Sequence, residues 1–154
     1  MRDETQTAAK GLRELVAFRT AGQDFCIDIM SVREIRGWSH ATLLPHTPDY
    51  VCGVINLRGS VVPIVDLSAR LALGKLEPSE RNVIIIVLIG QQVIGILVEA
   101  VFDILSVDEA DLQATPEVAS AQARAIIKGI FTDDERTLRL IDLPALFPEA
   151  EYAA

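Results

Sequence analysis

The stretch that decides the fold is residues 44–67, LPHTPDYVCGVINLRGSVVPIVDL. Within it, residues 51–57 and 61–65 form two apolar runs rich in valine and isoleucine, separated by Arg-Gly-Ser at 58–60. Two such runs on either side of a glycine-containing turn are typical of a β-hairpin. Pro63 interrupts the second run. Because proline cannot donate a hydrogen bond to a ladder, we expect this strand at a sheet edge or with a bulge.

A faint internal repeat extends outward from this hairpin. Residues 26–35 match residues 95–104 at an offset of 69, with apolar residues aligned and Glu34 on Asp103. Residues 53–67 match 129–143 at an offset of 76, each running from a glycine to an Asp-Leu pair. Two matches in the same order predict a duplicated unit of about 70 residues, and so few copies indicate two similar subdomains rather than a solenoid.

Most of each unit is expected to be strand, because short apolar runs alternate with turn signals. The expected strands are 15–20, 25–29, 51–57, 61–65, 83–89, 93–98, 125–131 and 137–141. Short strands at this spacing indicate small antiparallel barrels or sandwiches. The 17 uncharged residues 82–98 are interrupted by Gly-Gln-Gln at 90–92, and they fall short of the roughly 18–20 needed to span a bilayer. We therefore expect a cytoplasmic protein with no direct membrane insertion.

Three short helices are expected. Residues 29–36 carry apolar side chains at i, i+3 and i+6, the spacing of one helix face. Asp66 is expected to cap a helix over 67–73, and Asp142 a last turn near 143–147. We expect a single domain over 14–147 that divides into subdomains 20–72 and 82–145, with the chain crossing between them. Residues 1–12 and 149–154 are expected to be flexible tails.

Composition and motifs exclude several classes of function. The 14 Lys and Arg against 22 Asp and Glu give a net charge of −8, which disfavours nucleic acid because phosphate contacts need a basic surface. Phosphate loops, dinucleotide fingerprints and nucleophile elbows are absent from the sequence, so the motifs point to no catalytic residue and no cofactor. An active site assembled from residues far apart in the chain stays an open alternative at this point. Cys26, His40, His46 and Cys52 have no usual zinc spacing, so no metal site is predicted. We expect the cysteines to be buried small hydrophobic residues, with a disulfide as the alternative.

Two residues keep alternative interpretations. Arg58, at the predicted hairpin tip, is either a solvated turn residue or an ion-pair or interface anchor, since arginine is enriched at binding hot spots. Val32 is either a core residue or part of an exposed apolar surface.

Residues 44–67 resemble the hallmark of the CheW family, the coupling proteins of bacterial chemosensory arrays. The matching residues are Pro45, Pro48, Tyr50, Gly53, Asn56, Leu57, Arg58, Gly59, Pro63, Asp66 and Leu67. Residues 14–37, 93–105 and 126–147 agree with the family pattern in the same order, so the resemblance covers nearly the whole chain.

The resemblance implies a fold and a function. The fold is mainly β, with two small five-stranded β-barrel subdomains packed over a shared hydrophobic core and a few short helices. The function is that of a free-standing, non-enzymatic scaffold, monomeric when isolated. It would couple the cytoplasmic hairpin tips of methyl-accepting chemoreceptors to the CheW-like domain of the histidine kinase CheA, at arrays under the inner membrane. The alternative is a small barrel that binds another protein or single-stranded nucleic acid outside chemotaxis.

The resemblance also implies roles for individual residues. Receptor-binding residues would be Val32, Glu34, Arg58, Gly95, Val101 and Ile104. Kinase-binding residues would be Gly53, Asn56 and Leu57. Some members of the family have a basic residue at the position of Gln113 and an aromatic residue at that of Val118, where a second kinase contact is implied. This chain has neither.

Overall fold

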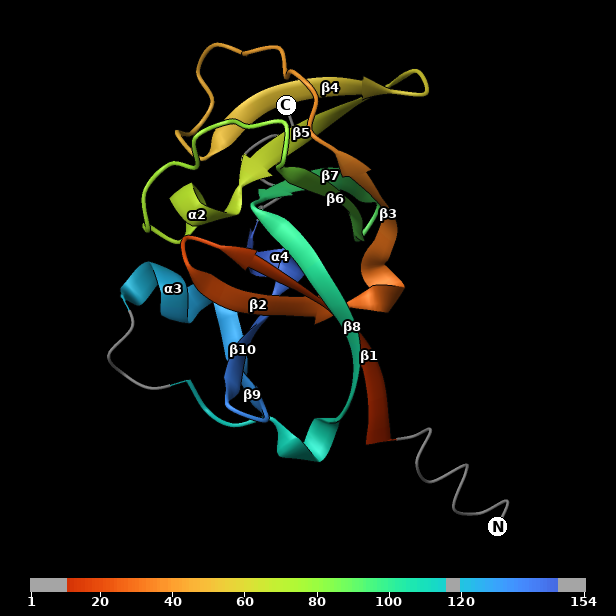
Figure 1. The fold of residues 1–154 in the computed structure, drawn as a ribbon. Coiled ribbons are helices and arrows are strands. Elements are labelled where there is room, and N and C mark those ends of the chain that lie inside the picture. The colour runs from red at the N-terminus through yellow and green to blue at the C-terminus, as the bar shows by residue number, and fades with distance from the viewer. Residues whose placement is uncertain (1–10, 116–119, 147–154) are drawn as a thin grey trace.

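The computed structural model describes residues 11–115 and 120–146, and these form two five-stranded sheets with a few short helices (Figure 1). Sheet A contains β1 (Leu12–Thr20), β2 (Gln23–Asp28), β8 (Ala100–Asp108), β9 (Ile127–Asp133) and β10 (Arg136–Ile141). Sheet B contains β3 (Val32–Gly37), β4 (Val51–Leu57), β5 (Ser60–Asp66), β6 (Val83–Ile89) and β7 (Gln92–Val98). The helical segments are η1 (Ile29–Ser31), α2 (Leu67–Arg70), η2 (Glu109–Asp111), α3 (Ala121–Ile126) and α4 (Leu143–Leu146). The prediction of a mainly β chain with two five-stranded sheets is confirmed.

The two sheets have the same strand order. Sheet A runs β8-β1-β2-β10-β9 and sheet B runs β3-β6-β7-β5-β4. Aligning β1–β5 with β6–β10 makes these orders identical, except that the hairpins β1–β2 and β6–β7 have changed places. Each hairpin pairs with the other half of the chain on both sides. The pairing is antiparallel with an edge strand, β1 with β8 and β6 with β3, and parallel on the other side, β2 with β10 and β7 with β5. As a result, residues 12–28 lie in one sheet with β8, β9 and β10, and residues 83–98 lie in the other sheet with β3, β4 and β5.

Alternating side chains on the strands divide the core into three clusters. In β1, Val16 and Phe18 belong to the largest cluster, which also contains Ile85 and Ile96 of sheet B. This central cluster is shared by the two sheets. Leu15 and Ala17, which alternate with them, belong to a cluster whose buried residues all come from sheet A. Sheet B has a separate cluster of its own. Because β1 is buried on both faces, its sequence is a continuous apolar run, and a short run of this kind predicts a strand.

Neither sheet closes into a barrel. In the part of the chain that the structure describes, no ladder joins β8 to β9 or β3 to β4. The segment after each edge strand instead adds one bridge to the far strand, Thr42 to Val54 in sheet B and Gln113 to Ile130 in sheet A. The expectation of closed barrels is therefore not met.

The helix expected over 29–36 is wrong. The chain makes one short turn, η1, and then enters β3. A register shift between Val32 and Glu34 marks a bulge, after which Ile35 pairs with Ile85 while Val32 pairs with Val87. A bulge inserts one extra residue, so residues three apart fall on the same face of a strand and imitate helical spacing.

Other boundaries differ in detail. Asp66 caps α2 as predicted, since its side chain accepts from the Ala69 N–H at 3.3 Å, but the helix ends at Arg70. Residues expected to begin a strand at 125 lie instead in α3, and β8 was not predicted. Of the expected tails, residues 1–10 and 149–154 lie outside the described residues, whereas Leu12 already belongs to β1. No helix among the described residues is long and apolar enough to cross a membrane.

Candidate functional site

An ion pair joins the tip of the β4–β5 hairpin to the edge strand β3. The Arg58 guanidinium donates to the Glu34 carboxylate at 3.1 Å, and Arg36 lies 3.5 Å from the same oxygen. Arg58 occupies a left-handed turn position with φ of 51°, and its side chain is 72% exposed. Arg58 is therefore both a solvent-exposed turn residue and a member of an ion pair. An exposed pair of this kind contributes about 0–1 kcal/mol, so it leaves the guanidinium available to a partner at little cost to the fold.

Val32 and Val101 hold equivalent positions on the edge strands β3 and β8. Both are half-buried, and both pack against the central cluster shared by the sheets. Val32 therefore combines its two interpretations, because one side of it meets the core and the other meets solvent. Ile104 follows Val101 by three residues and is 52% exposed. The two edge strands thus present apolar surface beside the contact between the sheets.

The residues predicted for kinase binding build the β4–β5 hairpin. Gly53 is buried with φ of 145°, and a Cβ there would lie 2.5 Å from the Thr42 carbonyl oxygen. The Asn56 side chain accepts a hydrogen bond from the Gly59 N–H at 3.0 Å, which fixes the turn. Leu57 is buried in the cluster of sheet B. Only Asn56 of the three offers an exposed side chain.

The nine predicted site residues fall into three classes of exposure. The exposed residues are Asn56, Arg58 and Ile104; the half-buried ones are Val32, Glu34 and Val101; the buried ones are Gly53, Leu57 and Gly95. Gly95 lies inside sheet B, where a Cβ would lie 2.5 Å from Ile64 Cδ1 and 2.9 Å from Ile84 Cγ2. It permits close packing of β7 and has no surface of its own.

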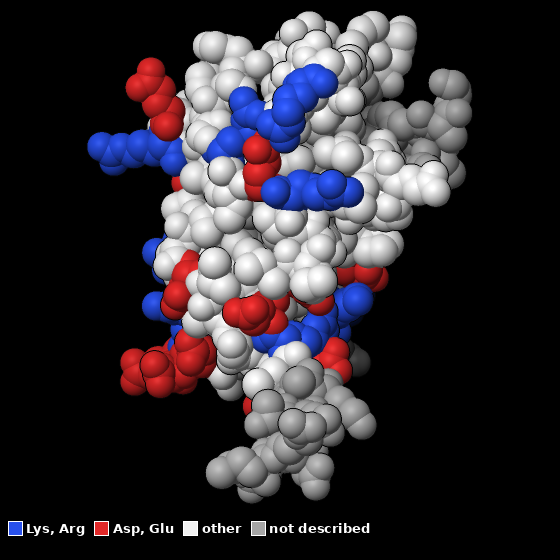
Figure 2. All heavy atoms as spheres, turned by 90° about the vertical axis from the view of Figure 1, so that its right-hand side faces the viewer, with Lys and Arg blue, Asp and Glu red and all other residues white. Residues whose placement is uncertain are grey.

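Sequence reasoning missed several exposed apolar side chains near this site. Met30, Ile35 and Val61 are all exposed, and Val61 is 66% so. Val62 and Ile64 of β5 belong to the sheet B cluster. Because side chains alternate along a strand, this pattern alone could have placed Val61 outside that cluster. In Figure 2, much of the middle of one face of the molecule carries no charged side chain, between charged groups above and below. A face of this kind suits a protein partner.

The cysteines have no reactive character. Both are free, and burial raises the pKa of the Cys26 thiol to about 12 and of the Cys52 thiol to about 11. Each therefore stays a protonated thiol at neutral pH, which is a poor nucleophile. Within residues 11–115 and 120–146, no three His, Cys, Asp or Glu side chains are grouped as metal ligands.

Comparison with known proteins identifies the family. The model of the CheW-like domain matches residues 14–151. The chain belongs to the CheW-like family. It is 52% identical over 145 residues to a probable chemotaxis protein CheW of Rhizobium etli, covering 94% of each chain. It is 48% identical to chemotaxis protein CheW of Rhizobium meliloti, covering all of this chain and 99% of the relative.

A solved structure agrees with this family membership. The scaffolding protein TtCheW from Thermoanaerobacter tengcongensis superposes with a TM-score of 0.80 at 34% identity, over 88% of this chain and 87% of that one. The names of these relatives and of the scaffolding protein indicate a chemotaxis adaptor, which is not a class of enzyme. At the position implied for a second kinase contact, the backbone of Gln113 pairs with Ile130 through hydrogen bonds of 2.8 and 2.9 Å. Val118 lies outside the described residues.

Proposed function

We propose that this chain couples the cytoplasmic tips of chemoreceptors to the histidine kinase CheA and relays receptor state to kinase activity. The observation that carries the proposal is the 52% identity to a probable chemotaxis protein CheW along 94% of both chains. The protein would work in the cytoplasm at receptor arrays, as a monomer when isolated and without a catalytic step of its own.

Exposure separates direct contacts from supporting residues in this proposal. Arg58 and Ile104 are exposed, and Val32, Glu34 and Val101 are half-exposed, so these five side chains would touch the receptor. An amphipathic helix lays apolar residues into an apolar surface, which the edge strands β3 and β8 supply. Gly95 would act by shaping sheet B. Asn56 would touch the kinase, and Gly53 and Leu57 would hold its hairpin in position.

Reconstitution tests the proposal. The purified chain is added to the histidine kinase and a receptor cytoplasmic fragment from the same organism, and kinase autophosphorylation is measured with and without it. We expect the chain to make kinase activity depend on the receptor. Equal phosphorylation with and without the chain would contradict a coupling role.

Arg58→Ala sharpens this experiment. It should change the free energy of unfolding by no more than about 0.5 kcal/mol, the usual range for surface substitutions. If Arg58 anchors the receptor, the same change should weaken receptor binding by about 2 kcal/mol or more. Arg81→Ala is the matched control, because Arg81 is also exposed but lies ahead of β6, away from the β4–β5 tip. Normal receptor binding by the Arg58 variant would remove Arg58 from the contact.

A further inference from the structure

Two equivalent positions in the sheets carry an acidic residue. Glu34 of β3 pairs with Ile86 of β6, and Asp103 of β8 pairs with Ala17 of β1. Glu34 and Asp103 are 69 residues apart, which is the repeat offset, and so are Ala17 and Ile86, because β1 is the counterpart of β6. Asp103 therefore holds in sheet A the register position that Glu34 holds in sheet B.

Two other equivalent positions carry opposite charges. Arg58 is the first residue of the turn closed by Leu57 and Ser60, and Asp134 is the first residue of the turn closed by Asp133 and Arg136. Both turn residues are left-handed, with φ of 51° and 56°. The repeat thus places an arginine at one hairpin tip and an aspartate at the other.

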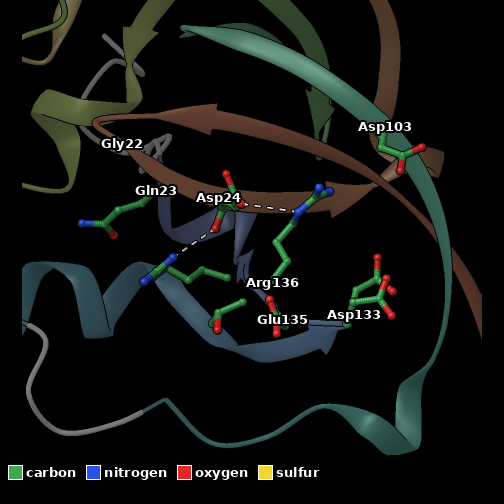
Figure 3. Close-up of a pocket in the computed structure, with 10 residues that line it drawn as sticks. Gly22, Gln23, Asp24, Asp103, Asp133, Glu135 and Arg136 are labelled. Carbon is green, nitrogen blue, oxygen red and sulfur yellow. Dashed lines mark hydrogen bonds and ion pairs between the residues drawn. The ribbon is translucent and has the colours of Figure 1, made fainter.

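This difference leaves the end of sheet A open. In sheet B the turn residue and the edge-strand acid attract each other, at 3.1 Å. In sheet A the corresponding Asp134 and Asp103 are both acids, so they cannot form such a pair. A hollow of about 760 Å³ is lined by both acids, with Asp103 on β8 and Asp133 below it at the end of β9 (Figure 3). Among the described residues, no ion pair involves Asp103, Asp133, Asp134 or Glu135.

Both arginines of the hollow contact Asp24, one at its carboxylate and one at its backbone carbonyl. Five carboxylates and two guanidiniums line it. Arg136 lies 3.8 Å from the Asp24 carboxylate and over the Phe102 ring at 4.6 Å. Arg139 donates to the backbone carbonyl of Asp24 at 3.3 Å. Arg19 also donates to the Asp24 carboxylate, at 2.9 Å. Asp24 therefore has arginine partners within the chain, whereas Asp103, Asp133, Asp134 and Glu135 have no such ion pair with any described residue.

We propose that the open end of sheet A receives an arginine side chain from a partner protein. This arginine would pair with Asp103 and the acids of the β9–β10 turn, as Arg58 pairs with Glu34 in sheet B. The sister sheet supplies the argument for a guanidinium, because the equivalent site in the same molecule is filled by one. A guanidinium also presents several donors in a planar fork, which suits several carboxylates better than a point charge does. None of these acids is among the residues proposed above for the receptor or the kinase, and Asp103 lies on β8 between Val101 and Ile104.

A titration with a defined probe tests this proposal. The probe is a disulfide-closed hairpin peptide that copies residues 55–62, INLRGSVV. Its control is the same peptide with citrulline, which is uncharged, in place of arginine. Backbone amide shifts of the isotope-labelled full chain are followed by NMR. We expect shifts at residues 22–24, 103 and 133–137 with the arginine peptide only, and weaker shifts as salt is added.

Three variants place the arginine in the hollow. Asp103→Asn should weaken peptide binding about three- to fivefold, the effect of losing one exposed ion pair. Asp134→Arg should weaken it further, because the new arginine would pair with Asp103 within the chain and close the hollow. Asp49→Asn, an exposed acid in the loop before β4, should leave binding unchanged. The amide spectrum of each variant reports directly whether it is folded.

Each contrary result overturns the proposal. Equal shifts from the citrulline peptide would show that charge is not recognised. Unchanged binding by Asp134→Arg would place the peptide elsewhere. Shifts of the same amides with magnesium chloride alone, and none with the arginine peptide, would show that the acids bind a small cation instead of a partner's arginine.

Discussion

At Gly53 and at Gly129, a backbone carbonyl of another segment occupies the space that a Cβ atom would need. A Cβ would lie 2.5 Å from the Thr42 oxygen at Gly53, and 2.5 Å from the Gln113 oxygen at Gly129. Both carbonyls belong to the single bridges that follow the edge strands. The repeated glycines thus let the chain cross the open side of each sheet.

Alanine at either glycine should destabilise the protein. The backbone would have to move away from the new methyl group, which costs about 1–3 kcal/mol, typical of overpacking. Gly53→Ala should cost about 1 kcal/mol more than Gly129→Ala, because only Gly53 has a positive φ, 145°. The measurement is the free energy of unfolding in urea.

Gly37→Ala is the matched control for this pair. Gly37 also lies on an edge strand, with no positive φ and no atom within 4 Å of its Cβ position. It should leave stability unchanged or raise it by about 0.4–1 kcal/mol, through the unfolded state. Similar losses in all three variants would show that a general effect of removing glycine, and not the close carbonyl, is being measured.

The repeat shows how far sequence reasoning reaches. The repeat has an offset of 69 around Val32 and Val101 and of 76 around Gly53 and Gly129. Residues related by these offsets hold equivalent positions in the strand order and register of the two sheets. The exchange of the β1–β2 and β6–β7 hairpins is not visible in the sequence. Whether β2 pairs with β5 or with β10 depends on contacts between residues far apart in the chain, and the same apolar pattern serves both pairings.

The candidate site was harder to read than the fold. Arg58 stood out because it lies at a hairpin tip, but its partner Glu34 lies in a segment that was misread as helix. The bulge between Val32 and Glu34 produced that error. A bulge also occurs in β8, where Val101 and Ile104 are three residues apart and pair with Phe18 and Val16 of the central cluster. Periodicity could not reveal it, since a bulged strand and a helix turn share this spacing.

Arg70 should stabilise the protein by holding α4 to α2. Its guanidinium donates to the carbonyls of Leu146 and Ala145 at 2.8 and 3.1 Å, and lies 4.6 Å from the centre of the Tyr50 ring. Arg70→Ala would leave two helix-end carbonyls without these donors, and should cost about 1.5–3 kcal/mol in urea unfolding. Arg70→Lys should recover only part, because an ammonium lacks the planar fork. Full recovery by lysine would show that charge alone is sufficient.

Asp66 should make stability depend on pH. Its carboxylate accepts from Ala69 at 3.3 Å and from Leu76 at 2.8 Å, but burial outweighs these bonds and raises its pKa above the ordinary 3.8. The folded state therefore holds this proton more tightly than the unfolded state does. The stabilisation is complete below the ordinary pKa and is lost as pH rises through the folded one.

Asp66→Asn isolates this contribution, because asparagine does not titrate. Asparagine keeps one acceptor oxygen and points a donor at the other N–H, so the variant should be less stable at every pH. The difference in unfolding free energy between the original protein and the variant should shrink as pH rises from about 4, the unfolded value. A difference that grows with pH would mean that the pKa of Asp66 is lowered by its hydrogen bonds.

Val32 and Val101 should show the energetics of half-buried surface residues. Each packs on the central cluster from one side only, so Val32→Ser and Val101→Ser should each cost about 1 kcal/mol of unfolding free energy. Val98→Ser provides the buried reference, since Val98 is 0% exposed in the same cluster. Losing its methyl groups and burying a hydroxyl should cost about 2–4 kcal/mol.

Binding then separates surface from core. On the proposed coupling function, Val32→Ser and Val101→Ser should weaken binding of a receptor cytoplasmic fragment more than binding of the kinase, measured by calorimetry on folded variants. If both valines touch one receptor helix, the loss in the double variant should differ from the sum of the single losses, because residues that share a partner are coupled. Additive losses would place them on separate contacts. A cost for Val32→Ser equal to that of Val98→Ser, with both partners bound normally, would make Val32 a core residue and remove β3 from the receptor surface.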